Sequence, residues 1–209
     1  YSVTGNQQTD AGDYELTLAG QGNFTGTKTV EWSIAKKALT LTAGSGSKPY
    51  DGTPLTSNAV MAEGFVAGES ATYACTGSQL DVGSSANIVT VIDWTGAKAG
   101  NYAVTKKPGV LKVVPLAVTV KSKDISKPFD GTPLKLTAGD IELSCGVSGG
   151  HALPAGESFV YGDFAERTEA GQTSATFTVA AGANTKLTNY AITPVYGTIT
   201  ITKSATEIG

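Results

Sequence analysis

The chain contains the stretch Lys48-Pro49-Tyr50-Asp51-Gly52-Thr53-Pro54-Leu55, which returns 79 residues later as Lys127-Pro128-Phe129-Asp130-Gly131-Thr132-Pro133-Leu134. A fixed long period is the sequence mark of a repeat array. Within each octapeptide, proline fixes φ, Asp-Gly supplies a tight turn, and Thr-Pro restarts an extended chain. We therefore expect each octapeptide to form a turn that launches a strand, with its aromatic ring available to a core.

Other landmarks repeat in step. The stretch 101–105, Asn-Tyr-Ala-Val-Thr, returns 88 residues later as Asn-Tyr-Ala-Ile-Thr at 189–193, so the second copy carries nine extra residues. We place this insertion in the Gly-rich stretch 146–156. Residues 1–36 correspond to the back half of another copy, because Thr-Asp-Ala-Gly at 9–12 corresponds to Leu-Asp-Val-Gly at 80–83.

These correspondences predict the domain organisation. We expect the C-terminal part of a preceding repeat at 1–36 and a linker to a next segment at 204–209. Between them we expect a complete repeat at 37–114 and a second complete repeat, with the loop insertion, at 115–203. The joints between copies are about four residues long, and one contains Pro115, which makes them too short to behave as flexible coil.

Composition narrows the function classes. Charged residues are 16% of the chain, below the roughly 25% of average soluble domains, and Gly numbers 26. The net charge is −3 and the 15 Lys and Arg form no basic run, which argues against a nucleic-acid partner. No apolar stretch approaches the roughly 20 residues of a membrane span, so we expect no membrane insertion of these residues.

Alternation of apolar and polar residues between Gly, Pro and Asp predicts an all-β fold. The last run, Thr-Ile-Thr-Ile-Thr at 198–202, alternates strictly, as a sheet with one wet face requires. Six or seven short strands in fewer than about 90 residues are typical of a small sandwich. We expect strands at 14–18, 29–34, 38–43, 54–60, 69–75, 86–93, 102–106, 109–114, 116–122, 133–138, 140–145, 157–161, 173–180, 190–193 and 197–203.

The octapeptide, the middle motif G-S-Q-x-D-V-G-S-S-A-N and the ending G-N-Y-x-V with G-V-L-x-V together resemble Ig-like repeats of bacterial cell-surface proteins. These are the YDG-type and related MBG-type repeats, found in tandem in wall-anchored adhesins. The resemblance covers 38–114 well, and 116–203 with the insertion and a degraded middle motif at 167–171. It implies tandem small Ig-like β-sandwiches forming an elongated rod, located outside the cell and anchored to the cell wall. It brings no catalytic residue.

One histidine and several aspartates could in principle act in catalysis or bind metal, but each also has a structural interpretation. His151 is the only histidine, and no nucleophile–base pairing recurs between copies, so we expect no enzyme. Isolated aspartates, each in a turn or alone, are predicted to cap turns rather than to bind metal. The candidates considered for a metal were Asp51, Asp81, Asp93 and Asp130.

The aromatic residues that recur at equivalent positions, Tyr50 with Phe129 and Tyr102 with Tyr190, are predicted to be core residues. Trp94 and the 146–156 insertion, which contains His151, have no counterpart in the other copy. We single out Trp94 and His151 as the residues to which a ligand-binding role would fall.

Two further pairings were weighed. The cysteines Cys75 and Cys145 occupy non-equivalent positions, which excludes a repeated intradomain disulfide and favours two small thiols over a bridge between domains. A Lys–Asn isopeptide cross-link has candidates, since Lys48 and Lys127 recur, as do the asparagines at 101 and 189. We expect these asparagines to cap the turn before a strand instead.

Two functions from different classes remain. The first is a non-catalytic structural spacer in the stalk of a bacterial surface adhesin, needing no cofactor and contacting neighbouring repeats as a monomer. The alternative is a module that binds a host glycan or host surface protein through loops of one repeat.

Overall fold

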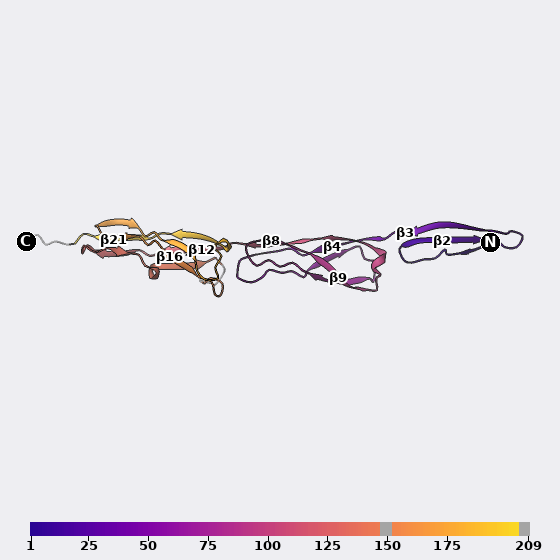
Figure 1. The fold of residues 1–209 in the computed structure, drawn as a ribbon, viewed down its shortest axis with the longest axis horizontal. Helices are drawn as coiled ribbons and strands as arrows, with labels where there is room; N and C mark the ends of the chain where they lie inside the picture. Colours follow the sequence, from indigo (N-terminus) through magenta and orange to yellow (C-terminus); the bar gives the residue numbers. More distant parts are fainter. Residues whose placement is uncertain (147–151, 205–209) are drawn as a thin grey trace, which may run out of the picture. The chain divides into compact units, whose positions relative to one another are not determined.

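The computed structural model describes residues 1–146 and 152–204, which form strands and short 3-10 segments (Figure 1). The all-β prediction is confirmed. No helix within these residues is long and apolar enough to cross a membrane.

The elements of the first part of the chain are β1 (Ser2–Thr4), β2 (Gly12–Ala19), β3 (Thr27–Ile34), β4 (Lys37–Ala43), β5 (Gly46–Pro49), β6 (Val60–Glu63), β7 (Ser70–Cys75), β8 (Gly83–Asn87), β9 (Val89–Thr95), η1 (Ala99–Asn101), β10 (Tyr102–Lys107) and β11 (Gly109–Val114). Those of the second part are β12 (Leu116–Ser122), β13 (Ile125–Pro128), β14 (Leu134–Lys135), η2 (Ala138–Asp140), β15 (Ile141–Cys145), β16 (Phe159–Gly162), β17 (Glu166–Arg167), β18 (Gly171–Ser174), β19 (Thr178–Ala181), η3 (Leu187–Asn189), β20 (Tyr190–Val195) and β21 (Thr198–Thr202).

Contacts divide the chain into two compact units. Unit 1 comprises Tyr1–Gly46, Thr56–Ser78 and Ser84–Leu111, and unit 2 comprises Ser47–Leu55, Gln79–Gly83 and the described residues from Lys112 onward. The first octapeptide and the turn at 79–83 therefore pack in one unit with residues of the second copy.

Unit 1 is built around β4. This strand pairs with β10 in parallel and with β6 antiparallel, and β7 pairs with β9. Every second residue of β4 from Leu39 to Ala43 is buried, and these residues form a core with Val89 and Tyr102. The antiparallel sheet β1-β2-β3 belongs to the same unit, and none of residues 1–36 is buried.

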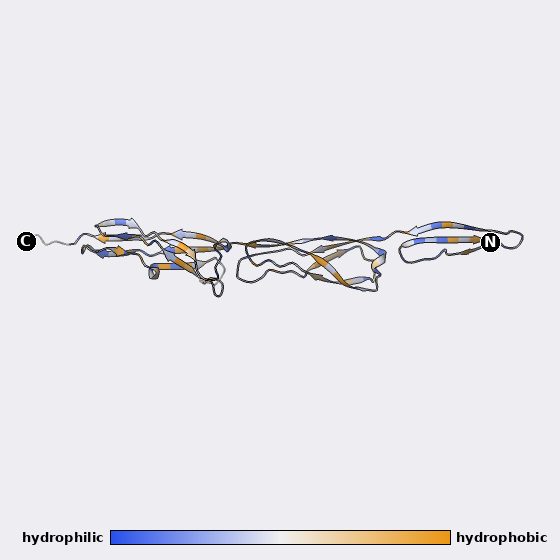
Figure 2. Ribbon diagram, viewed as in Figure 1, coloured by the Kyte–Doolittle hydropathy of each residue, from blue (hydrophilic) through white to orange (hydrophobic). Residues whose placement is uncertain are grey.

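Unit 2 repeats this arrangement around β12, which pairs with β20 in parallel and with β15 antiparallel. β16 pairs with β19 as β7 does with β9, and the sheet β13-β21-β18 has the same pattern as β5-β11-β8. Ile199 and Ile201 of β21 are buried while Thr198 and Thr200 between them are half-buried, so the predicted alternation is confirmed. Apolar and polar residues are interspersed along the strands throughout (Figure 2).

The structure corrects several predicted strands. The stretch 86–93 is divided at Ile88, because β8 joins the sheet of β11 while β9 pairs with β7. The stretch 173–180 is divided in the same way into β18 and β19. In each case one continuous apolar pattern covers two strands that belong to different sheets. Periodicity alone does not show where the chain leaves one sheet and enters the other.

The octapeptide also differs from expectation, since the strand precedes the turn. Lys48-Pro49 ends β5 and Lys127-Pro128 ends β13, and both strands lie at the edge of their sheet, where proline is tolerated. After the turn, Leu55 forms only an isolated bridge with Gln79, so the strand predicted at 54–60 is wrong. The strand predicted at 133–138 shortens to β14.

Candidate functional site

The first octapeptide turn is organised by one carboxylate oxygen. Oδ1 of Asp51 accepts hydrogen bonds from the Thr53 backbone N–H at 2.9 Å, from the Thr53 hydroxyl at 2.8 Å and from Lys48 Nζ at 2.7 Å. Lys48 Nζ also donates to the Thr53 carbonyl oxygen at 2.7 Å. The carboxylate thus accepts the hydrogen bonds that close the turn around Gly52, whose φ is +76°. The predicted turn-capping role of Asp51 is confirmed.

The second octapeptide builds the same turn. Asp130 Oδ1 accepts from the Thr132 N–H at 2.9 Å, from its hydroxyl at 2.8 Å and from Lys127 Nζ at 2.7 Å. The hydrogen bond from Lys127, together with those from Thr132, holds the pKa of Asp130 far below its usual value. The lysines of both octapeptides are therefore engaged by aspartate, not by the asparagines considered for a cross-link.

Unit 2 contains a polar cluster that joins the turn at 79–83 to the end of η3. Asn189 is 1% exposed; its Oδ1 accepts from the Val82 N–H at 2.9 Å and its Nδ2 donates to Asp81 Oδ1 at 2.9 Å. Lys186 Nζ contacts the other oxygen of Asp81 at 2.5 Å. We call this arrangement the Asp–Lys–Asn clamp, and the hydrogen bonds from Lys186 and Asn189 lower the pKa of Asp81.

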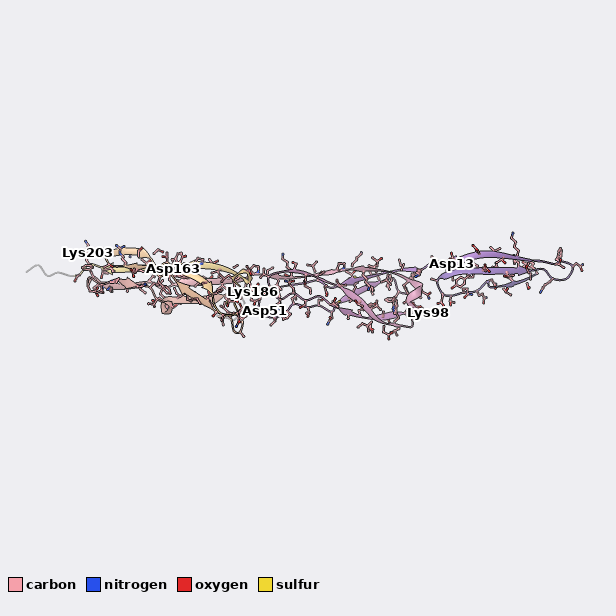
Figure 3. The ribbon with its side chains drawn as sticks, in the orientation of Figure 1. Asp13, Asp51, Lys98, Asp163, Lys186 and Lys203 are labelled. Atoms are coloured by element: carbon pink, nitrogen blue, oxygen red, sulfur yellow. The ribbon has the colours of Figure 1, made fainter. Side chains whose placement is uncertain are left out.

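The same clamp occurs in unit 1 with different residues. Asn101 Oδ1 accepts from the Ala11 N–H at 2.8 Å, and its Nδ2 donates to Asp10 Oδ1 at 2.9 Å. Lys98 Nζ contacts Asp10 Oδ2 at 2.6 Å. Lys98 and Lys186 are both labelled in Figure 3. The prediction that Asn101 and Asn189 cap their own turns is therefore wrong, because each bonds residues about ninety or more positions earlier in the chain.

Beside each clamp a tyrosine hydroxyl meets a glutamate. In unit 2, Glu157 accepts from Tyr190 at 2.6 Å and, through its other oxygen, from Tyr50. The two tyrosine rings contact edge to face with centroids 5.7 Å apart. Burial, with the hydrogen bond to Glu157 added, raises the pKa of Tyr50 to about 12. Both hydroxyls are thus held protonated, as donors to one carboxylate.

In unit 1 the corresponding tyrosine is Tyr102, which donates to Glu69 Oε2 and accepts from the Val66 N–H at 3.1 Å. Trp94 stacks on Tyr102 with centroids 5.7 Å apart and meets Phe65 edge to face at 6.1 Å. Trp94 is half-buried and packs against the unit 1 core, which gives it a structural role, while ligand binding by Trp94 stays a prediction.

The other predicted residues fall as follows. Tyr50, Tyr102 and Tyr190 are buried, as predicted for core residues, but Phe129 is 38% exposed, which corrects its expected place in a core. His151 and residues 147–150 of the insertion lie outside the described residues. Cys75 and Cys145 are half-buried free thiols, as favoured by the sequence.

The candidate metal-binding aspartates have other partners. Asp51 and Asp130 each accept from a lysine and from a turn N–H, and Asp81 accepts from the side chains of Lys186 and Asn189. Asp93 accepts from the Trp94 N–H at 2.8 Å. Each carboxylate therefore has a capping or pairing role.

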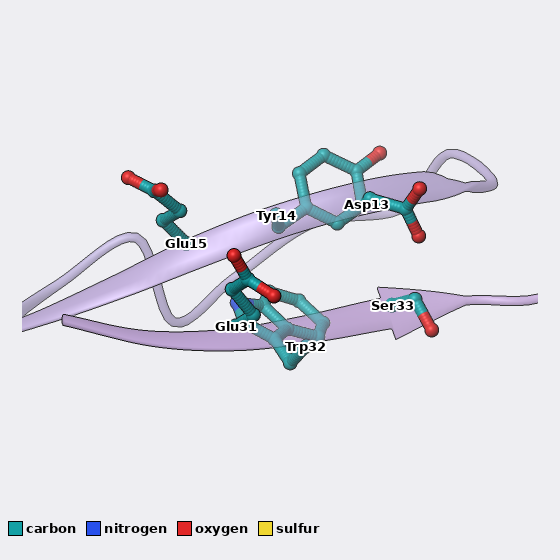
Figure 4. A pocket seen from close by; sticks show the side chains of 6 residues that line it. All are labelled: Asp13, Tyr14, Glu15, Glu31, Trp32 and Ser33. Atoms are coloured by element: carbon teal, nitrogen blue, oxygen red, sulfur yellow. The ribbon is translucent and has the colours of Figure 1, made fainter.

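A surface hollow of about 560 Å³ lies on the sheet β1-β2-β3 (Figure 4). Tyr14 and Trp32 form a cross-strand pair within it, with ring centroids 5.2 Å apart. Their polar tips donate to the backbone oxygens of Asp10 and Gly5. The rest of the lining is acidic or small: Asp13, Glu15, Glu31 and Ser33. Because successive side chains of a strand point to opposite faces, the rings of Tyr14 and Trp32 lie on one face of this hairpin and the carboxylates of Glu15 and Glu31 on the other.

Sequence reasoning missed the clamp, although its signal is present. Lys98 and Asn101 recur at 186 and 189 with the same Lys-x-x-Asn spacing, and Asp10 recurs at 81. What the spacing does not give is that each aspartate meets the Lys-x-x-Asn element of the following copy.

Comparison with known proteins found a match to a family model. No curated protein and no solved structure matched the chain. Residues 35–109 match the YDG domain. The octapeptide at 48–55, η1 and β10 lie inside this match. Residues 35–109 of the chain are therefore a YDG domain.

Proposed function

We propose that the chain is a non-catalytic structural spacer, formed by stalk repeats of a bacterial cell-surface adhesin. In this proposal the copies are small Ig-like β-sandwiches in tandem, arranged as an elongated rod outside the cell and anchored to its wall in the parent protein. Neighbouring repeats are the partners, and the chain is monomeric.

The observation that carries the proposal is the duplicated Asp–Lys–Asn clamp. The same three side chains recur in both units, and their polar groups bond residues of one copy to residues of the next. A recurring set of this kind indicates a structural joint between copies rather than a ligand site. The YDG domain at 35–109 supports the same function together with the resemblance of the repeat motifs to those of wall-anchored adhesins.

Ligand binding is the second candidate, and the hollow at Tyr14 and Trp32 favours it. The paired, half-buried rings of Tyr14 and Trp32 offer an aromatic surface on which a ligand could stack. A host glycan or a host surface protein would be the ligand.

Small-angle X-ray scattering of the chain tests the spacer. The expected profile is that of an extended particle whose maximum dimension grows by one repeat length when a further copy of 37–114 is inserted before Pro115. A compact particle, or no growth on insertion, would contradict the spacer. Saturable binding of a glycan that is lost in Trp32→Ala would favour the second candidate.

A further inference from the structure

Unit 1 contains a second, more enclosed hollow at the edge of its clamp. Its volume is about 270 Å³. Val66 and Glu69 line one side and Asn101 and Tyr102 another, and two further segments, 9–11 and 34–37, complete it. The lining residues that matter below are Ala11, Ala35, Val66, Glu69, Asn101 and Tyr102.

The six residues in unit 2 that correspond to this lining are Val82, Val114, Pro154, Glu157, Asn189 and Tyr190. Pro154 lies in the stretch expected to have no counterpart, but the Glu157 N–H donates to its carbonyl at 3.1 Å as the Glu69 N–H donates to that of Val66 at 3.0 Å. There they surround Tyr50, the aromatic residue of the first octapeptide. The Tyr50 N–H donates to the Val114 carbonyl at 2.9 Å, and the ring and hydroxyl contact Tyr190 and Glu157. The site that is a hollow in unit 1 is thus filled by Tyr50 in unit 2.

Exposure of the equivalent residues supports this correspondence. Asn189 is 1% exposed and Asn101 is half-buried. Pro154 is half-buried, whereas Val66 is 48% exposed. The residues in unit 1 therefore have the arrangement of the filled site but lack the cover that the octapeptide turn gives in unit 2.

We propose that this hollow is a socket for the tyrosine of a Lys-Pro-Tyr-Asp-Gly turn carried by another repeat of this type. The incoming backbone N–H would donate to the Ala35 carbonyl, and the tyrosine ring would lie edge to face on Tyr102. The incoming hydroxyl would donate to Glu69 Oε1, because Tyr102 already occupies Oε2. The inference does not depend on a cell-surface location.

The chemistry of the socket selects tyrosine over phenylalanine. A carboxylate in a half-buried pocket gains from each donor that reaches it, and Glu157 in the filled site has two phenol donors. The turn at Phe129 is exposed but supplies no hydroxyl, and Tyr50 is already seated in unit 2. One difference is Lys37, which lines the hollow where buried Leu116 stands in unit 2; its alkyl stem can cover the ring while its ammonium reaches water.

The first test uses a synthetic peptide with the sequence of residues 46–55 and the ¹⁵N-labelled full chain. We expect amide shifts confined to the socket, at Ala35, Glu69, Asn101 and Tyr102. A peptide with phenylalanine in place of its tyrosine should bind at least about tenfold more weakly, because a hydrogen bond to a charged group is lost. Equal binding of the two peptides, or shifts located elsewhere, would overturn the proposal.

In the second test the turn is part of the same chain as the socket, so its binding does not depend on the low affinity of a free peptide. Residues 1–7, Tyr-Ser-Val-Thr-Gly-Asn-Gln, correspond to 73–79, Tyr-Ala-Cys-Thr-Gly-Ser-Gln, so a copy of 37–72 placed before Tyr1 supplies the turn in register. Replacing the tyrosine of the added turn by alanine should lower the unfolding midpoint as much as Tyr50→Ala does in its own site. No change in that midpoint, while Tyr50→Ala lowers it, would refute the socket.

Self-association gives a third readout on the chain as it stands. We expect a monomer in analytical ultracentrifugation. Concentration-dependent oligomers that disappear in Phe129→Ala would show that the turn of a second copy fills the socket, and would overturn the choice of a tyrosine-bearing turn.

Discussion

Replacement of Asn189 by alanine tests the clamp most directly. The change removes the acceptor of the Val82 N–H and the amide donor to Asp81, both at 2.9 Å. A hydrogen bond to a charged group contributes about 1.5–3 kcal/mol, and a buried N–H left without a partner costs about 1–3 kcal/mol. Water that enters after the truncation can replace part of the lost hydrogen bonding, so the two contributions do not add in full. We therefore expect Asn189→Ala to lower the free energy of unfolding of unit 2 by about 2–4 kcal/mol.

The assay follows from where the tryptophans lie. Trp32 and Trp94 both belong to unit 1, so their fluorescence follows unit 1, while circular dichroism follows both units. In urea, Asn189→Ala should move only the part of the transition seen by circular dichroism, and the Val82 amide should lose its protection from hydrogen exchange.

Asn101→Ala is the matched control in unit 1. It removes the same two bonds, but Asn101 is half-buried, so the loss should be smaller, and it should appear in the tryptophan transition. A loss below about 0.5 kcal/mol for Asn189→Ala, with the Val82 amide still protected, would refute the clamp as a stabilising element, since surface changes lie within that range.

The isosteric change Asn189→Asp adds a sign test. It places a second carboxylate against Asp81, so the pKa of this pair rises in the folded state above the unfolded value of about 3.9. The folded variant then binds more protons than the unfolded chain, and its stability falls as pH rises. Relative to the natural chain, the variant should therefore recover stability between pH 7 and pH 4, and no recovery would contradict the contact between residues 81 and 189.

Three further predictions follow from single contacts. Asn87→Ala should cost about 2–4 kcal/mol in the tryptophan-detected urea transition, because this fully buried side chain makes three hydrogen bonds with backbone groups; an unchanged midpoint would contradict this. Stability should fall between pH 10 and about pH 12, because Tyr50 stays protonated when folded and ionises when unfolded, and Tyr50→Phe should show a shallower fall by circular dichroism. Gly131→Ala should cost about 1–2 kcal/mol for its φ of +80°, and Gly52→Ala clearly more in thermal melts, because its Cβ would also lie 2.8 Å from Pro154; equal costs would argue against that contact.

Much of the fold follows from the sequence alone. Strict alternation predicted β21 and β12, because a strand with one face in the core must repeat its apolar residues with a period of two. The Asp-Gly pair predicted the octapeptide turn, because the hydrogen bonds that cap this turn join residues only two to five positions apart. The repeat spacing identified the copies, since it depends only on comparing the chain with itself. The motifs within the first complete copy resemble YDG-type repeats, and the YDG domain at 35–109 agrees with that resemblance.

Only the tertiary structure decided which residues meet across the chain. Asn101 and Asn189 look like local caps in the sequence, yet their partners lie at positions 11 and 82, and no local rule relates the two. The burial of Tyr50 and the exposure of Phe129 make the same point, because the two turns share their capping hydrogen bonds and only the first is covered by other segments. Turns and alternation depend on neighbouring residues and can therefore be predicted from the sequence. Long-range pairings depend on how distant segments pack. The hollow beside Glu69 is formed by such segments, so only the tertiary structure shows it.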